Sequence, residues 1–260
     1  MAFVKFLQFA LAVVSTMHSA IAYPLTASAS KLQSRAPAAV YHCTTPNTVA
    51  LTFDDGPWQY LYDITNSLAS ANASGTFFFN GRNWGCIYDE DSVNRVRHAY
   101  NNGHQIASHT WSHKNLSQIS EGDMHREFSL IDEAISKITG AVPAFMRPPY
   151  GESNDKVLEV AAAHGQTVAI WDFDNQDTLG KSPEDSKRIY DDAIRRHPST
   201  ILTINHEVKE TTAHQVIPYA ITELKKAGYR LVTLAECLGR QPYKSIGSPQ
   251  NRDGSWTCNK

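Results

Sequence analysis

The sequence predicts an α/β fold, a distorted (β/α) barrel of about seven parallel strands, from two observations. Short apolar segments alternate with longer amphipathic ones from residue 48 to residue 238, which is typical of parallel β/α units. Polar residues repeatedly come directly after the apolar segments, and in a β/α barrel all these strand ends lie on one face. The alternation also fits an open doubly wound sheet.

The strands are predicted from short runs of β-branched and other apolar residues. The first, TVALTF at 48–53, is typical of a buried strand. The segment 144–151 predicts a strand that runs into the turn RPPYG, and the last segment predicts a strand that ends in a short turn. In order, the predicted strands are 48–53, 75–81, 104–109, 144–151, 167–174, 199–207 and 230–238.

The helices are predicted from apolar residues at helical spacing and from their end signals. Glycines follow several of them, as is common where a helix ends. Pro183, Glu184 and Asp185 suit the first turn of a helix. In order, the predicted helices are 59–72, 90–103, 121–140, 155–165, 183–197 and 214–229.

The N-terminal segment predicts secretion. Residues 1–22 combine Lys5, the apolar run FLQFALAVV and small residues before Ala22, which is the pattern of a signal peptide. A membrane anchor is the alternative, but the apolar run is short and is broken by Ser15 and His18. We therefore expect an extracellular or cell-wall protein, monomeric and without membrane contact once the signal is removed.

Three further segments follow the signal. Residues 23–40 indicate a linker or pro-segment, residues 41–240 the catalytic domain, and residues 241–260 a polar tail. The net charge of −2 and the absence of a Lys/Arg run argue against nucleic acid as a partner. Sequons at Asn72 and Asn115 leave glycosylation open.

The segment SHTWSH indicates a metal site. His109 and His113 are four residues apart, a spacing that puts two imidazoles on one face of a helical turn. Thr110 stands where the zinc-protease motif HExxH has its glutamate, so a metalloprotease is disfavoured. A catalytic zinc usually has three protein ligands, so a third ligand and a base are needed from elsewhere.

The pair Asp54–Asp55 in LTFDDGP can supply both. One aspartate would complete an Asp-His-His site, and the other would take the proton from a bound water. Neighbouring strand residues point to opposite faces, but a turn directly after a strand, set here by Gly56 and Pro57, can bring both side chains near one cation.

The segments TFDDGP, SHTWSH, RPPYG, DNQD and LTINH resemble, in order and character, the five motifs of the polysaccharide deacetylases, the NodB-like domains of carbohydrate esterase family 4. The resemblance spans roughly residues 43–238 and is greatest to fungal chitin deacetylases. It implies a NodB fold and a divalent metal, zinc first, with cobalt or another divalent ion possible. It also implies chitin or chitooligosaccharide as substrate, with acetylxylan and peptidoglycan as alternatives.

The resemblance implies roles around the metal. Asp54 would be the general base, and Asp55, His109 and His113 would be the metal ligands. Arg147 would pair with Asp54 and keep it ionised, since a neighbouring cation favours the charged carboxylate.

It also implies roles around the substrate. His206 would protonate the leaving amine, and Asp177 would orient and charge that histidine. The backbone N–H of Tyr150 would stabilise the oxyanion, and its side chain would wall the acetyl pocket. Leu202 and Ile204 would line that pocket.

The fourth motif departs from the family pattern. The family often has a tryptophan where this chain has Thr178, which leaves Asp174 as an alternative to Asp177. The family places a sugar-contacting tryptophan near Trp84. We expect Trp171 to be structural because it lies inside a predicted strand.

The four cysteines suit an oxidising compartment. Barrel closure would bring Cys43, before the first strand, near Cys237, after the last. By elimination Cys86 would pair with Cys258 and pin the tail near the Trp84 loop, although spacing alone leaves the connectivity open.

An alternative from another functional class is a carbohydrate-binding protein without catalytic activity, which would protect or mask chitin.

Overall fold

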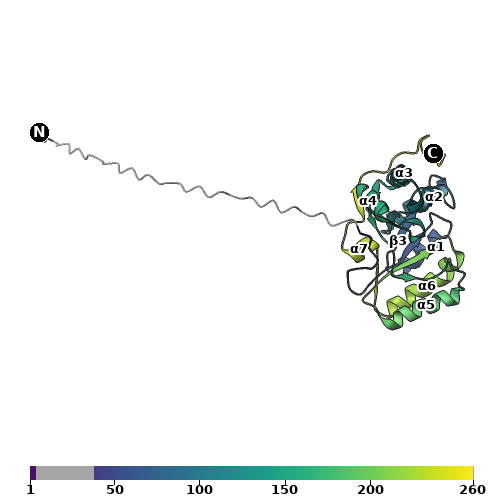
Figure 1. The fold of residues 1–260 in the computed structure, drawn as a ribbon. Helices are drawn as coiled ribbons and strands as arrows, with labels where there is room; N and C mark the ends of the chain where they lie inside the picture. The colour runs from purple at the N-terminus through teal and green to yellow at the C-terminus, as the bar shows by residue number, and fades with distance from the viewer. Residues whose placement is uncertain (4–37, 260) are drawn as a thin grey trace. The chain divides into compact units, whose positions relative to one another are not determined.

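The centre of the fold is a mostly parallel sheet whose strands are connected by helices, as Figure 1 shows. The structure is a computed structural model, and it describes residues 1–3 and 38–259. Residues 4–22 of the predicted signal peptide and residues 23–37 of the predicted linker lie outside the described residues. The chain divides into the units Met1–Arg35 and Ala36–Lys260, and the fold below is that of the second.

The sheet has nine strands in the order β10-β1-β9-β2-β3-β4-β6-β7, with β8 paired to β9, and every pairing is parallel. This confirms the predicted α/β class. The strands are β1 (Thr48–Ala50), β2 (Thr52–Asp54), β3 (Thr76–Phe79), β4 (Gln105–Ser108), β6 (Phe145–Met146), β7 (Thr167–Val168), β8 (Phe173–Asp174), β9 (Thr200–His206) and β10 (Arg230–Val232).

Two predicted strands are interrupted. The segment 48–53 is divided at Leu51 into β1 and β2. The segment 167–174 is divided into β7, which pairs with β6, and β8, which pairs with β9. It therefore joins β7, at one end of the strand order, to β9, and the ladder is broken between β7 and β8 instead of closing into a regular barrel.

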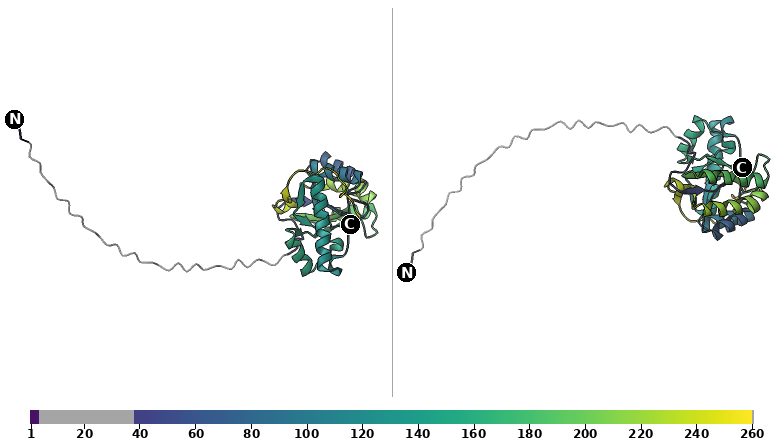
Figure 2. Two further views of the ribbon diagram at one scale, coloured as in Figure 1. Left: turned by 90° about the horizontal axis from the view of Figure 1, so that it is seen from above. Right: turned by 90° about the horizontal axis from the view of Figure 1, so that it is seen from below.

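Six helices confirm the predicted helical segments within a few residues at each end: α1 (Leu61–Ser70), α2 (Glu90–Asn101), α3 (Glu121–Thr139), α4 (Asp155–Ala163), α5 (Pro183–Arg196) and α6 (Ile217–Lys226). The caps explain their ends. Ser182 and Asp185 form a capping box at the start of α5, and Gly140 ends α3 at φ 81°. Figure 2 shows α3, in teal, lying along one side of the domain.

The last predicted strand is only partly correct. After β10 the chain forms a short helix, α7 (Leu234–Leu238), because the Thr233 side chain accepts a hydrogen bond from the N–H of Glu236 and caps it. The shorter helical segments are η1 (Leu116–Gln118), η2 (Pro149–Gly151) and the π-helical η3 (Thr212–Val216). In the described part of the chain, no helix is both long and apolar enough to cross a membrane.

The C-terminal residues are more ordered than a polar tail. They form β11 (Tyr243–Ile246), which pairs antiparallel with β5 (Ala141–Pro143). Trp256 is buried. The disulfides are Cys43–Cys237 and Cys86–Cys258, which is the expected connectivity. The β5–β11 pairing joins the predicted segments 41–240 and 241–260.

Candidate active site

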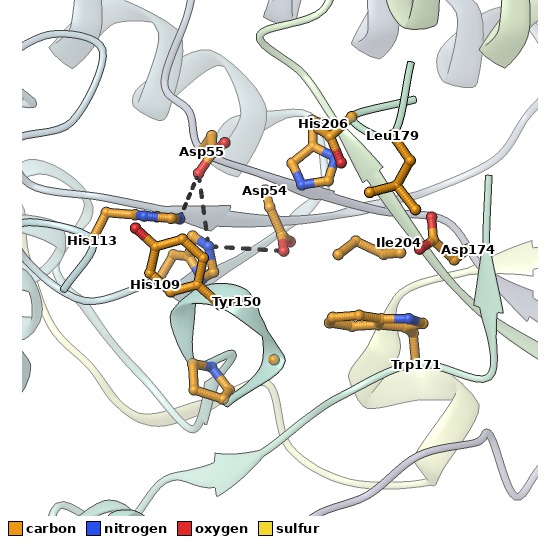
Figure 3. A pocket seen from close by; sticks show the side chains of 13 residues that line it. Asp54, Asp55, His109, His113, Tyr150, Trp171, Asp174, Leu179, Ile204 and His206 are labelled. Atoms are coloured by element: carbon orange, nitrogen blue, oxygen red, sulfur yellow. Dashed lines mark ion pairs between the residues drawn. The ribbon is translucent and has the colours of Figure 1, made fainter. Parts of the chain in front are cut away.

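A pocket of about 360 Å³ lies at the carboxyl ends of the parallel strands. Figure 3 shows its lining, in which Asp55, His109 and His113 lie close together and Trp171, Ile204 and Leu179 lie on the opposite side with Asp174. The polar lining includes Asp54, Asp55, His109, His113 and His206, and the apolar wall includes Tyr150, Trp171, Leu179 and Ile204. Strand register explains the gathering, because Asp54 of β2 and His206 of β9 are partners across the ladder.

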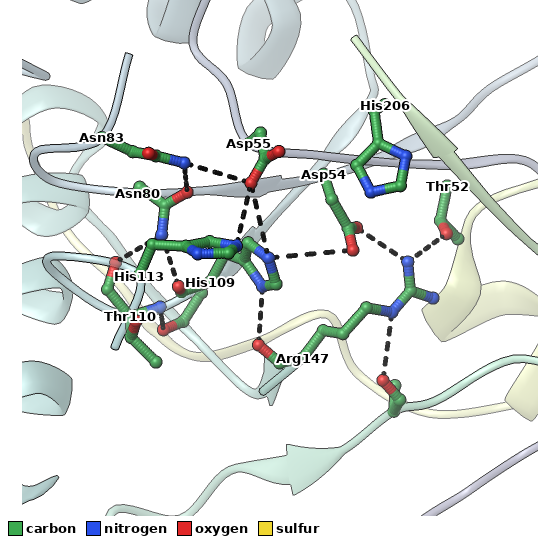
Figure 4. Close-up of polar contacts among 12 residues, drawn as sticks. Thr52, Asp54, Asp55, Asn80, Asn83, His109, Thr110, His113, Arg147 and His206 are labelled. Carbon is green, nitrogen blue, oxygen red and sulfur yellow. Dashed lines mark hydrogen bonds and ion pairs between the residues drawn. The ribbon is translucent and has the colours of Figure 1, made fainter. Parts of the chain in front are cut away.

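Asp55, His109 and His113 form a possible metal site, with one ligand atom of each within 4.8 Å of the others. Asp55 Oδ1 lies 3.1 Å from His113 Nε2 and 3.7 Å from His109 Nε2 (Figure 4). His109 Nδ1 lies 2.7 Å from the carbonyl oxygen of Arg147. That carbonyl can only accept, so Nδ1 carries the proton and Nε2 is left free to bind a cation. Two imidazoles and a carboxylate suit a divalent transition metal.

Neighbouring groups hold Asp55 as a carboxylate. Burial opposes its ionisation, but the hydrogen bond with His113 and the fields of His109 and His206 outweigh burial and lower its pKa to about 2. Asn83 Nδ2 also donates to Asp55 Oδ1 at 3.1 Å. Asp55 itself has φ 76°, which turns its side chain towards the histidines directly after β2.

Asp54 pairs with a different partner. Its Oδ1 accepts a hydrogen bond of 2.8 Å from Arg147, and both side chains are buried. The guanidinium also donates to the Thr52 hydroxyl at 2.6 Å and to the carbonyls of Ala169 and Ile170 at 3.2 and 2.8 Å. Those carbonyls lie at the break between β7 and β8. The Arg147 side chain therefore gives hydrogen-bond partners to both carbonyls and also holds the Asp54 carboxylate in place.

His206 pairs with Asp177 and not with Asp174. Asp177 Oδ1 lies 2.7 Å from His206 Nδ1, and Oδ2 accepts the backbone N–H of His206 at 2.9 Å. Asp174 instead accepts the N–H of Gln176. Burial disfavours the charged imidazole, but the hydrogen bond and charge of Asp177 outweigh burial and raise the pKa of His206 to about 9.

Leu202 does not line the pocket, contrary to the sequence prediction. It is buried in an inner apolar cluster with Phe78 and Ala107. Leu202 and Ile204 project from the same face of β9, but Leu202 lies two residues farther from the strand end, so only Ile204 reaches the pocket.

Trp84 lies outside the residues that line the pocket. Its ring is half exposed and its centroid lies 5.7 Å from that of Trp58. Tyr150 does line the pocket, at its exposed edge, and has φ 63°. Its ring meets that of His113 edge-on with centroids 4.9 Å apart.

Trp171 was expected to be structural, but it lines the pocket. It lies in the break between β7 and β8, so strand alternation does not fix where its side chain points. A Cβ added at Gly151 would lie 2.7 Å from its ring, so the glycine in RPPYG permits this close approach. Gly151 belongs to the motif RPPYG, so the sequence already marked this position. Leu179 also lines the pocket, but it lies in none of the five motifs and could not be predicted from them.

A curved parallel sheet with a possible Asp-His-His metal site beside a buried Asp–Arg pair defines the class of the carbohydrate deacetylase domains. The comparisons with known proteins agree. The polysaccharide deacetylase family matches residues 41–169. A chitin deacetylase from Pestalotiopsis sp is 36% identical over 214 residues, which is 79% of this chain and 69% of the relative. The chain therefore belongs to the polysaccharide deacetylase family, as the motifs predicted.

Two further relatives extend the comparison. A probable peptidoglycan-N-acetylglucosamine deacetylase from Arthroderma benhamiae is 35% identical over 201 residues, covering 76% of this chain and 45% of that relative. The solved structure of the chitin deacetylase from Colletotrichum lindemuthianum superposes with a TM-score of 0.77 at 28% identity, covering 84% of this chain and 98% of that one.

We expect Arg147→Met to lower the free energy of unfolding by about 3–5 kcal/mol, because it leaves the Asp54 charge buried without its partner. Urea unfolding would measure the loss. The double variant Arg147→Met/Asp54→Asn removes both charges and is expected to lose less. A single variant within about 1 kcal/mol of wild type would contradict the burial and pairing described above.

We expect Asp177→Asn to lower the pKa of His206 from about 9, measured by NMR titration of the ring. A histidine whose pKa is raised by folding contributes stability fully below its unfolded pKa, about 6.5. The difference in free energy of unfolding between wild type and Asp177→Asn should therefore be largest below that pH and shrink as the pH rises through about 9. A difference that grows with rising pH would contradict the pairing of His206 with Asp177.

Proposed function

We propose that this protein is a metal-dependent chitin deacetylase, which removes acetate from N-acetylglucosamine units of chitin or chitooligosaccharides. The observation that carries the proposal is the separation of the two adjacent aspartates: Asp55 faces two histidines and Asp54 faces Arg147. Relatives named chitin deacetylase, at 36% and 30% identity, support the substrate.

Asp55, His109 and His113 would hold a divalent cation, zinc first and cobalt as an alternative. Such a cation, when bound, supplies a Lewis acid that acidifies water and polarises a carbonyl. His109 can serve as a neutral ligand, because burial lowers its pKa despite the nearby carboxylates.

Asp54 would be the general base. Arg147 pairs with Asp54 Oδ1, and Asp54 Oδ2 lies 3.8 Å from His109 Nε2. Asp54 would therefore stand beside the proposed metal site, whose three possible ligands are Asp55, His109 and His113. It would accept a proton from the attacking water as the new C–O bond forms at the acetamide carbon. The backbone N–H of Tyr150 would stabilise the oxyanion.

His206 would be the general acid. Its raised pKa keeps it protonated at neutral pH, and it would give that proton to the glucosamine nitrogen as the C–N bond breaks and acetate leaves. Asp177 would keep the imidazole in place and charged. Ile204, Trp171 and Leu179 offer an apolar wall for the acetyl methyl group, and Trp84 would stack on a sugar ring farther out.

Secretion is part of the proposal and is supported by the N-terminal sequence and the two disulfides. Peptidoglycan is the second candidate substrate, favoured by the relative from Arthroderma benhamiae. Acetylxylan stays an alternative, because the same site could cleave an acetate ester.

We expect Asp54→Asn and Asp55→Asn to differ. Asp55→Asn should lose the metal, because it removes a charged ligand, whereas Asp54→Asn should keep metal and lower kcat by about 10²–10⁴-fold. Metal content by elemental analysis and acetate release would measure this, with the exposed surface variant Asp63→Asn as control. Loss of metal from both variants would show that the pair is divided wrongly.

We expect acetate release from N-acetylglucosamine oligomers to exceed release from peptidoglycan and acetylxylan. Parallel assays on the three substrates, followed by mass spectrometry of the products, would measure the preference. Activity on acetylxylan alone would exclude chitin as substrate. Equal chitin binding by wild type and Asp54→Asn, with no acetate release from either, would favour a binding protein without activity.

A further inference from the structure

The loop that joins the two proposed histidine ligands has a strained backbone. Thr110 has φ 69° and His113 has φ 56°, values in the left-handed region that residues other than glycine rarely adopt and that β-branched residues such as threonine avoid. Such strain persists only where the surroundings hold it. Asn80 provides one restraint, since its Nδ2 donates to the carbonyls of His109 and Thr110 at 2.5 and 3.2 Å (Figure 4).

A second restraint comes from Glu127 on α3, a residue that the five motifs do not include. Its side chain is buried. Oε2 accepts the backbone N–H of Ser112 at 2.6 Å, and Oε1 accepts the Ser112 hydroxyl at 2.5 Å. Hydrogen bonds to an ionised acceptor are stronger than those between neutral groups. Glu127 therefore holds Ser112, the residue directly before His113, through two hydrogen bonds.

The polar contacts of the Glu127 carboxylate are with Ser112 and Lys114, the two residues on either side of His113. Besides Ser112, its neighbour is Lys114 Nζ at 3.7 Å. Glu127 is not among the residues of the possible metal site or of the pocket lining, so the proposed chemistry does not use it directly. A buried carboxylate is costly unless it is paired, and here every partner lies within two residues of a proposed metal ligand.

We propose that Glu127 is a positioning residue, which holds the strained loop in the conformation that brings His109 and His113 to one point. The inference rests on the metal site proposed above. Without Glu127 the loop can relax at Thr110 and His113, and only a fraction of molecules would present both imidazoles together. The apparent metal affinity then falls by that fraction, although no ligand has been removed.

Zinc titration of the metal-free proteins against a chromogenic chelator tests this without measuring activity. We expect Glu127→Ala to raise the zinc Kd by about 10–100-fold, the usual effect of losing a group that orients a ligand. Glu127→Asp keeps the charge but is one methylene shorter, and it should also bind more weakly. Glu127→Gln can accept from the Ser112 N–H and donate to its hydroxyl, so it should recover most of the affinity.

Ile131→Val is the matched control, since Ile131 is buried on the same helix but belongs to the main apolar core. It should lower the thermal midpoint and leave the zinc Kd unchanged. A wild-type zinc Kd in both Glu127→Ala and Glu127→Asp would overturn the positioning role, and Glu127→Asp alone decides if Glu127→Ala does not fold. No zinc binding by wild type would overturn the metal site itself, which separates the two failures.

Discussion

The buried ion pair between Arg147 and Asp54 is the constraint on which the rest of the site depends. The guanidinium lies inside the curved sheet and joins β2 to the interrupted segment between β7 and β8. At that break the carbonyls of Ala169 and Ile170 accept hydrogen bonds from the Arg147 side chain. The N–H groups of the same two residues donate to the carbonyls of Met146 and Val40, so the interrupted backbone keeps its partners. The same contact fixes Asp54 Oδ1 on Arg147, while its Oδ2 lies 3.8 Å from His109 Nε2.

The carboxylates around the pocket have different surroundings, which change their own pKa values or those of their neighbours in different directions. Asp55 has imidazoles as neighbours and a lowered pKa, and Asp177 raises the pKa of His206. Glu207, directly after His206, is buried, and burial raises its pKa to about 8 even though Oε1 accepts the N–H of Trp58. Its carboxyl also fills the space beside Gly56, where a Cβ would collide with it, so the turn after Asp55 depends on glycine.

The sequence predicted most of the fold and the polar half of the site, because both follow from alternation and from motifs that are local in the chain. The breaks at Leu51 and after Val168 could not be predicted, since they depend on which strand each half pairs with. The error at Leu202 has another cause, since alternation gives the face of a strand but not the depth of a residue along it. The error at Trp171 follows from the break itself, because Trp171 lies between β7 and β8. The role proposed for Glu127 could not be predicted from the sequence, because only the tertiary fold brings its carboxylate to Ser112.

The division between the two aspartates is the central claim, and it is tested most directly by a crystal structure of the wild-type protein with zinc, with the ion located by anomalous scattering. We expect one ion bound by Asp55, His109 and His113 at about 2.0–2.2 Å, with Asp54 still hydrogen-bonded to Arg147. An ion bound by Asp54, or an Asp54 that has left Arg147 to reach it, would contradict the separate roles assigned to the pair.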